Sequence, residues 1–250
     1  MLVTGASSGI GEASARRFAA EGAHLVLWAR RLERLNALGA QLQEQHGVQV
    51  FCAAVDVRDR TAVNEAAAAL ATADTVPDVL LNNAGLAAGL DLFQESDPDD
   101  WDRMIDTNIK GLLNVSRAVL PLMIARGRGH IINIGSTAGH LTYPRGNVYA
   151  ASKAAVRSLT DGLNLDCVGT PIRVSSVDPG FVDTEFSTVR FAGDEARARK
   201  VYEGFRALGA DDVADVIAYV AGLPEHVNVL DVLVMPTAQR NVYVLHRQAQ

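Results

Sequence analysis

Seven short apolar runs recur along the chain, and segments with helical periodicity separate them. The runs cover residues 2–3, 24–28, 48–55, 79–81, 131–134, 172–177 and 229–235, and the helical segments include 12–21, 32–45, 60–73, 101–126, 149–168 and 211–222. Two neighbouring parallel strands need a crossover, which is usually a helix, so this alternation predicts parallel strands rather than hairpins. No repeat or low-complexity linker divides the chain. The sequence therefore predicts one α/β domain over residues 1–250, a doubly wound seven-stranded parallel sheet with helices on both faces.

The composition limits the classes of function. The 250 residues carry a net charge of −6, which argues against broad binding to nucleic acids or to anionic membranes. Only two cysteines occur, Cys52 and Cys167, in separate segments and without a His-Cys cluster, so we expect neither a disulfide nor a metal. No apolar run reaches the roughly 18 residues of a transmembrane helix, and the segment before Thr4 is too short for a signal peptide. We therefore expect a cytoplasmic protein.

A glycine-rich turn, TGASSGIG, joins the first apolar run to the first helical segment. Its three glycines remove Cβ atoms where a pyrophosphate would approach the backbone and the N-terminus of the helix. Tight turns also favour glycine, and the spacing G-x3-G-x-G differs from the common G-x-G-x-x-G. We expect a phosphate-binding loop formed by Gly5, Ser7, Ser8, Gly9, Ile10 and Gly11.

The second apolar run ends in Ala29-Arg30-Arg31, where a dinucleotide-binding fold selects its coenzyme. An acidic residue there would bind the ribose 2′-hydroxyl of NAD, whereas arginine suits the 2′-phosphate of NADP. Arg30 and Arg31 therefore favour NADP(H), and a solvated start of the next helix is the alternative. The third run ends in Asp56-Val57, whose carboxylate and adjacent amide can hold an adenine ring.

Asparagines follow the fourth apolar run and interrupt the long helical segment after it. Asn83, Ala84 and Gly85 follow a strand at the end where open α/β sheets bind ligands, although asparagine also satisfies the backbone of turns. Asn108 is a poor residue for the middle of a helix. A bend that frees a carbonyl for a bound water would explain Asn108, and an exposed, merely tolerated side chain is the alternative.

Ser136, Tyr149 and Lys153 supply the groups that interconversion of an alcohol and a carbonyl needs. Tyr149 and Lys153 stand four residues apart, so a helix places both side chains on one face. A nearby ammonium favours the phenolate and so lowers the pKa of a phenol from about 10. Ser136 follows the fifth run and can orient a substrate oxygen towards that phenol. A single serine and a Tyr-x3-Lys pair also occur often by chance.

Residues 181–208 differ from the rest of the chain, with weak periodicity, several glycines and many charges. We expect this segment to form a mobile lid over the site. Arg190 lies within it between two apolar residues, and Arg145 lies in the loop before Tyr149. Either arginine can bind a substrate carboxylate through two hydrogen bonds. Solvated surface charge is the alternative for each.

Taken together, these motifs resemble the short-chain dehydrogenase/reductase family over nearly the whole chain. The matching motifs are TGASSGIG at 4–11, NNAG at 82–85, Asn108, Ser136, Tyr149-x3-Lys153 and Pro179-Gly180. The resemblance implies a Rossmann-type fold in which Tyr149 is the acid/base and Ser136 holds the substrate oxygen. It implies that Lys153 binds the nicotinamide ribose and lowers the pKa of Tyr149, and that Asn108 holds a relay water. It also implies coenzyme contacts from Tyr149, Lys153, Pro179, Gly180, Val182 and Thr184.

One departure from the family pattern is the first strand, because only residues 1–3 precede the glycine-rich turn. Such a short strand either weakens the centre of the sheet or reflects a trimmed N-terminus.

Four segments resemble more narrowly the NADP-dependent 3-hydroxy acid dehydrogenases, which include serine 3-dehydrogenase, L-allo-threonine dehydrogenase and malonic semialdehyde reductase activities. They are MIDTNIKG at 104–111, IINIGSTAG at 131–139, TEFSTVRF at 184–191 and LPEHVNVLDVLVMPT at 223–237. This likeness implies hydride transfer between NADP(H) and a small 3-hydroxy acid, with Arg190 favoured for the carboxylate, and a homotetramer paired through helices 101–126 and 149–168. The alternatives are a reductase of uncharged ketones or aldehydes and a coenzyme-sensing module, which the intact catalytic set disfavours.

Overall fold

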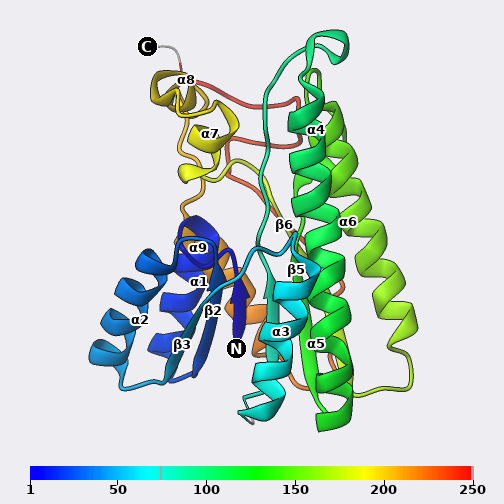
Figure 1. Ribbon diagram of the computed structural model, residues 1–250. Helices are drawn as coiled ribbons and strands as arrows, with labels where there is room; N and C mark the ends of the chain where they lie inside the picture. The colour runs from blue at the N-terminus through cyan, green and yellow to red at the C-terminus, as the bar shows by residue number, and fades with distance from the viewer. Residues whose placement is uncertain (74, 249–250) are drawn as a thin grey trace.

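The computed structural model describes residues 1–73 and 75–248, which form one sheet of seven parallel strands in the order β3-β2-β1-β4-β5-β6-β7 (Figure 1). The strands are β1 (Leu2–Thr4), β2 (Leu25–Ala29), β3 (Val50–Ala54), β4 (Val79–Asn82), β5 (Gly129–Ile134), β6 (Ile172–Pro179) and β7 (Asp231–Val234). The strand order starts at β1 and extends outward in both directions, so that β1 and β4 meet where the order reverses. The doubly wound parallel sheet predicted from the sequence is confirmed.

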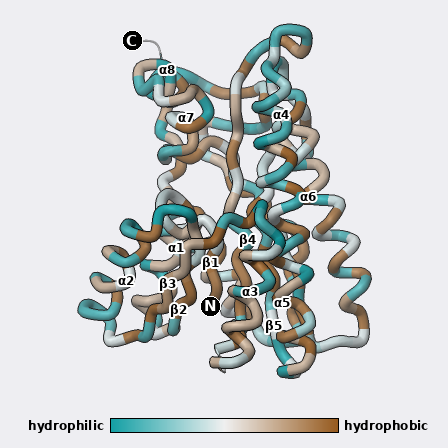
Figure 2. The backbone as a smooth tube through the Cα atoms, in the orientation of Figure 1, coloured by the Kyte–Doolittle hydropathy of each residue, from teal (hydrophilic) through white to brown (hydrophobic). Residues whose placement is uncertain are grey.

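The helices form two layers, one on each face of the sheet. One layer contains α1 (Gly9–Ala20), α2 (Leu32–His46) and α9 (Ala210–Ala221), and the other contains α3 (Arg60–Thr72), α5 (Leu112–Arg126) and α6 (Asn147–Asp166). Adjacent strand residues serve opposite layers, so Ile132 packs in the first core and Ile131 in the second. Figure 2 shows hydrophobic residues gathered in the strands between the layers. Burial on both faces explains why the strands read as continuous apolar runs.

The first strand is short but lies at the centre of the sheet. β1 pairs with β2 on one side and with β4 on the other, and Leu2 and Val3 are fully buried. The ammonium group of Met1 donates a hydrogen bond to the carbonyl oxygen of His24 at 2.7 Å. All three residues of β1 are therefore buried and paired within the sheet.

The helical segment expected over residues 101–126 is not one regular helix. α4 (Pro98–Ile105) leads into a π-helical turn, η2 (Asp106–Gly111), which α5 follows without a break. Asn108 lies inside this turn. A Cβ on Gly111 would stand 2.6 Å from Cγ2 of Val57, so the turn packs closely against the residues after β3. A π-helical turn changes the hydrogen-bond spacing locally and is frequently found at functional sites.

Residues 181–208 contain more regular structure than we expected. The segment holds α7 (Glu185–Arg190) and α8 (Glu195–Lys200), and a bridge between Val182 and Leu208 closes its base. The side chains of Thr184 and Asp194 cap these helices by accepting hydrogen bonds from main-chain amides. Helices of six residues are too short to show a clear period, so caps define them. In Figure 1 this segment stands beyond the carboxyl ends of the strands, across from α4.

Two short 3-10 turns complete the described elements, η1 (Phe93–Glu95) and η3 (Thr137–Gly139). Within residues 1–73 and 75–248, no helix combines the length and the apolar character needed to cross a membrane.

Candidate active site

A cleft with about 330 Å³ of open space lies at the carboxyl ends of the strands, between the glycine-rich turn and the segment that carries α7. The predicted coenzyme residues that line it are Gly5, Ser7, Ser8, Gly9, Ile10, Arg30, Arg31, Asp56, Val57, Asn83, Ala84, Gly85, Tyr149, Lys153, Pro179, Gly180, Val182 and Thr184. Ser136 lines the same cleft, whereas Gly11, Asn108, Arg145 and Arg190 do not. The fold thus brings residues from seven separate segments to one cleft.

The glycine-rich turn depends on its three glycines for two different reasons. Gly5 and Gly9 have φ angles of 65° and 56°, a region that residues with a Cβ adopt only with strain. A Cβ on Gly11 would stand 2.5 Å from the carbonyl oxygen of Gly5, so Gly11 permits the close approach of α1 to the turn. The side chain of Ser8 does not cap α1, so the first amides of the helix stay available. These features fit a pyrophosphate group.

The NNAG segment holds the glycine-rich turn in place. Nδ2 of Asn83 donates to the carbonyl oxygens of Thr4 at 2.9 Å and of Gly5 at 3.2 Å. Oγ1 of Thr4 accepts hydrogen bonds from the amides of Asn83 and Ala84. The Asn83 side chain therefore satisfies the backbone of the turn, which is the alternative that the sequence left open. Asn83 also lines the coenzyme cleft.

Arg31 lies between the glycine-rich turn and α7. Its guanidinium donates to Oγ of Ser7 at 3.1 Å, to Oγ of Ser8 at 2.7 Å and to a carboxylate oxygen of Glu185 at 3.0 Å. Arg34 binds the other oxygen of Glu185 at 2.7 Å. Arg30 lines the cleft beside them and is exposed. This cationic corner fits a 2′-phosphate, and Glu185 connects it to α7.

Arg58 is a cleft residue that the sequence did not single out. It lies directly after Asp56-Val57, and its Nη2 and Nε bind the Asp56 carboxylate at 2.6 and 3.0 Å. The hydrogen bonds from Arg58 lower the pKa of Asp56. The carboxylate expected to bind adenine is thus already paired. The other cleft residues not predicted are Ala29, Val55, Leu86, Thr107, Ile134, Gly135, Glu185, Phe186 and Val189.

Ser136, Tyr149 and Lys153 come together from β5 and α6. Ser136 precedes η3, and its Oγ accepts a hydrogen bond from the amide of Ala138 at 3.1 Å. Tyr149 lies in the first turn of α6 and Lys153 lies one turn later, with both side chains buried. Nζ of Lys153 donates to the carbonyl oxygen of Ile134 at 2.8 Å. Tyr149 and Lys153 thus lie one turn apart in α6, as the sequence spacing predicted.

The surroundings of Tyr149 disfavour the phenolate in the protein without ligands. Burial raises the pKa of Tyr149 to about 12, and Tyr143 adds to this effect. The hydroxyl of Ser136 and the guanidinium of Arg190 act in the opposite direction. We expected Lys153 to lower this pKa. The structure instead assigns the largest opposing effects to Ser136 and Arg190.

Burial also acts on Lys153, lowering its pKa to about 8. Its ammonium group is held by the Ile134 carbonyl oxygen, within the wall of the cleft. A Cβ on Gly85 would stand 3.6 Å from Nζ of Lys153 and 3.2 Å from Oδ1 of Asn108, so Gly85 separates these two residues. The absence of a side chain at Gly85 leaves the approach to Lys153 open.

Asn108 is buried, and its side chain is committed to the protein. Oδ1 accepts from the amide of Leu86 at 2.9 Å, and Nδ2 donates to the carbonyl of Leu86 at 2.8 Å and to Oγ of Ser152 at 3.0 Å. The alternative interpretation, in which Asn108 is exposed and merely tolerated, is therefore wrong. A relay water at Asn108 would bind its main-chain carbonyl in the π-helical turn rather than its side chain.

Arg190 lies against Tyr149 at the end of α7. Its guanidinium carbon is 5.1 Å from the centre of the Tyr149 ring, and its Nη2 donates to the hydroxyl of Tyr143. Nε of Arg190 is buried, and none of the described residues accepts a hydrogen bond from it. Arg190 and Arg145 border a small recess, separate from the main cleft, that Tyr149 also lines. Arg145 itself is exposed, with a φ of 65°.

Two curated relatives align with nearly the whole chain. The NADP-dependent 3-hydroxy acid dehydrogenase YdfG of Salmonella typhi is 49% identical over 240 residues, which are 96% of this chain and 95% of that protein. The sulfoacetaldehyde reductase of Chromohalobacter salexigens is 48% identical over 240 residues, which are 96% of this chain and 94% of that protein. By their names, both relatives are oxidoreductases, and the first is NADP-dependent.

A solved structure and a family pattern agree with these relatives. The closed form of serine dehydrogenase complexed with NADP+ superimposes with a TM-score of 0.91 at 45% identity and covers 99% of each chain. This coenzyme agrees with the NADP(H) expected from Arg30 and Arg31. The short chain dehydrogenase pattern matches residues 1–195. On these grounds the chain belongs to the short-chain dehydrogenase family.

Proposed function

We propose that the protein transfers a hydride between NADP(H) and the hydroxyl or carbonyl carbon of a small 3-hydroxy acid such as serine, allo-threonine or 3-hydroxypropionate. The observation that supports it most strongly is a buried phenol, Tyr149, that lines the coenzyme cleft and also contacts the cation of Arg190. NADP(H) supplies the hydride chemistry when it is bound. The protein supplies orientation, a proton acceptor and a site for the acid group.

The roles of the catalytic residues follow from their positions. In the oxidation direction Tyr149 takes the proton of the substrate hydroxyl, and Oγ of Ser136 holds the same oxygen. Lys153 lines the cleft, and its ammonium group holds the nicotinamide ribose in this proposal. The main-chain carbonyl of Asn108 holds the water through which the proton reaches solvent. Residues 181–208 act as the lid that excludes bulk water.

Arg190 is the group that selects an acid. Its Nε–H has no acceptor among the described residues, and the one hydrogen bond of its guanidinium goes to the neutral hydroxyl of Tyr143. A half-buried guanidinium whose Nε is buried, and which has no carboxylate partner among the described residues, favours an anionic ligand. The sulfonate handled by the relative named sulfoacetaldehyde reductase is an anion of the same kind. Arg145 is less suited to binding the acid group, because its side chain is exposed to solvent.

The second candidate function is reduction of uncharged ketones or aldehydes. It is supported by the contacts that Arg190 already makes, because a guanidinium held by Tyr143 and packed over Tyr149 could form a wall of the site without binding an acid group. The two candidates differ in whether the substrate must carry a negative charge two carbons from the reacting carbon.

A substrate panel separates the two candidates. The purified protein is assayed for reduced coenzyme with 3-hydroxypropionate, 2-hydroxyethanesulfonate and methyl 3-hydroxypropionate, each with NADP+ and with NAD+. We expect kcat/KM for the acid to exceed that for the methyl ester by roughly 10-fold or more, since a charge-assisted contact is lost in the ester. We also expect NADP+ to be preferred. Equal rates on the acid and its ester would refute the acid-binding role and favour the second candidate.

We also propose that the enzyme is a homotetramer, paired through the helices that contain residues 101–126 and 149–168. The support is the apolar surface on these elements, which includes Leu113 and Ile124 on α5 and Leu165 on α6. Light scattering should give a mass about four times the 26.6 kDa of the chain, and a monomer would contradict the proposal. A cytoplasmic location is part of this proposal, and the free thiols of Cys52 and Cys167 support it.

A further inference from the structure

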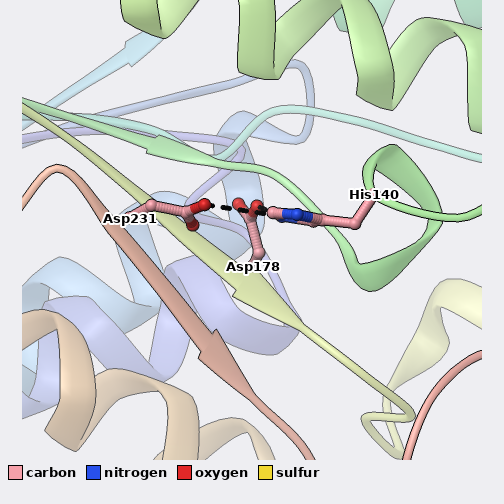
Figure 3. A group of neighbouring side chains, drawn as sticks. All are labelled: His140, Asp178 and Asp231. Carbon is pink, nitrogen blue, oxygen red and sulfur yellow. Dashed lines mark hydrogen bonds and ion pairs between the residues drawn. The ribbon is translucent and has the colours of Figure 1, made fainter.

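Asp178 is a buried carboxylate beside the proposed catalytic residues. It stands near the end of β6, directly before Pro179 and Gly180 of the cleft wall, and its side chain is 1% exposed. Oγ of Ser176 donates to Oδ1 of Asp178, and Nε2 of His140 contacts Oδ2 (Figure 3). Burying a carboxylate is costly unless it is paired and hydrogen-bonded. His140 and Ser176 therefore compensate for a charge that the sheet could not otherwise hold.

The cluster joins three elements at the edge of the active site. His140 comes from the end of η3, Asp178 from β6 and Asp231 from β7, and Figure 3 shows the three side chains meeting. Oδ2 of Asp231 is 3.7 Å from Nε2 of His140. Burial raises the pKa of Asp231, and the neighbouring charge of Asp178 adds to that increase. His140 thus lies against two carboxylates, of which only Asp178 is fully buried.

The Asp178 carboxylate lies directly against the main chain that connects two catalytic groups. A Cβ on Gly135 would stand 1.9 Å from Oδ1 of Asp178, so glycine alone allows this contact. Gly135 lies between Ile134, whose carbonyl oxygen binds Lys153, and Ser136. Burial is the main influence on the pKa values of Tyr149 and Lys153, and the negative charge of Asp178 raises both.

We propose that His140 is a positioning residue that screens the buried carboxylate of Asp178 from Tyr149 and Lys153, and thereby sets the pH range in which the enzyme oxidises its substrate. This inference rests on the proposed role of Tyr149 as the proton acceptor. The titratable groups around Asp178 come from three elements. His140 contacts it from the end of η3, and Asp231 lies near it on β7. The charge of Asp178 in turn affects Tyr149 and Lys153 on α6. Arg157, also on α6, acts on Asp231.

A purely structural role makes a different prediction. If His140 only tied η3 to β6, its loss would lower the melting temperature and kcat without moving the pH dependence. If His140 screens the carboxylate, its loss exposes Tyr149 to more negative potential. The phenolate then becomes harder to form, and the basic rise of kcat shifts to higher pH. Removal of the Asp178 charge has the opposite effect, so the two substitutions should shift the profile in opposite directions.

The test measures kcat for oxidation of 3-hydroxypropionate with saturating NADP+ between pH 6 and 11. This substrate has no group of its own that titrates within that range, unlike the amine of serine. We expect His140→Ala to move the midpoint of the rise upward by roughly half a pH unit or more, and Asp178→Asn to move it downward. His140→Gln keeps a donor that can reach Asp178 and should restore most of the wild-type midpoint. His46→Gln makes the same change at an exposed position of α2 and should leave the midpoint unchanged.

The decisive comparison adds His140→Ala to Asp178→Asn. With no charge left to screen, the second substitution should cause no further shift. Equal shifts of His140→Ala in both backgrounds, or no shift in the wild-type background, would overturn the inference. Different results would contradict the proposed function, namely an active Tyr149→Phe variant or a wild type that does not oxidise the substrate. If His140→Ala does not fold, as judged by circular dichroism and NADPH binding, His140→Asn in both backgrounds decides by the same criterion.

Discussion

The guanidinium carbon of Arg190 lies 5.1 Å from the ring centre of Tyr149, so the proposed acid-binding residue and the proposed acid/base are in contact. The cation of Arg190 opposes the increase in the pKa of Tyr149 that burial causes. A substrate carboxylate bound by Arg190 would bring C3, the hydroxyl carbon two positions away, close to the phenol. Binding and proton transfer would then be coupled through one pair of side chains.

Substitution of Arg190 tests this coupling. We expect Arg190→Ala to lower kcat/KM for 3-hydroxypropionate by roughly 10- to 100-fold, because charge-assisted hydrogen bonds to the carboxylate are lost. The methyl ester should lose much less, since it offers no charge to the guanidinium. Arg145→Ala, at the exposed arginine of the same recess, is the matched control and should leave both substrates unaffected. Equal losses on acid and ester would show that Arg190 supports Tyr149 but does not bind the acid group.

Removal of the Tyr149 hydroxyl tests the acid/base assignment. We expect Tyr149→Phe to lower kcat on the order of 10²- to 10⁴-fold, which is the usual contribution of a positioned proton acceptor. Binding of NADPH, followed by fluorescence titration, should be nearly unchanged because the ring still fills its place against Phe186. Tyr219→Phe makes the same change on the exposed side of α9 and should have no effect on kcat. Retained turnover in Tyr149→Phe would exclude the mechanism.

Arg31 and Arg34 offer a matched pair for testing coenzyme selection. Both bind Glu185, but only Arg31 contacts Ser7 and Ser8 and lines the cleft. We expect Arg31→Ala to reduce the preference for NADPH over NADH by about 10-fold or more, because a 2′-phosphate loses a cation at its site. Arg34→Ala removes an ion pair with Glu185 and should leave that preference intact. Similar effects of the two substitutions would assign selection to the ion pairs instead of to the phosphate contact.

The buried ammonium group of Lys153 predicts a stability that depends on pH. Burial lowers its pKa from 10.5 to about 8, so between these values the unfolded chain binds the proton more strongly than the folded protein. Stability contributed by this group therefore rises with pH across that window and is lowest below it. We expect Lys153→Met to be more stable than the wild type at pH 7, and the difference to shrink by on the order of 3 kcal/mol towards pH 10.5.

Denaturant unfolding of the two proteins at several pH values measures this difference. Burial raises the pKa of Tyr149 from 10.0 to about 12, which gives the opposite slope above pH 10, but that effect is present in both proteins and cancels. A stability difference that stays constant from pH 7 to 10.5 would mean that the ammonium of Lys153 is not desolvated in the folded protein.

The sequence allowed the fold and most cleft residues to be predicted because the signals were local. The glycine-rich turn combines positive φ angles at Gly5 and Gly9 with a contact at Gly11 that excludes a Cβ, and glycine alone meets both demands. Tyr149 and Lys153 owe their common face to a helical spacing that is visible within five residues. The strand order followed from alternating elements and the rules of parallel sheets.

Most of the contacts that could not be predicted join residues far apart in the chain. Glu185 and Arg31 are 154 residues apart, and His140 and Asp178 are 38 apart, so no spacing rule connects them. Asp56 and Arg58 are adjacent in the cleft and nearly so in sequence, yet only the folded geometry shows that one carboxylate is already paired. The short helices of the lid were missed because caps, rather than apolar periodicity, determine them.

The ion pairs of Glu185 connect α7 to α2 across the wall of the coenzyme cleft. If these ion pairs hold α7 over a dinucleotide seated on the glycine-rich turn, release of the coenzyme would require them to open. Because both ion pairs are exposed, dissolved salt weakens them. The maximal turnover of such an enzyme would then be limited by product coenzyme leaving, and it would increase as the ionic strength of the medium increases.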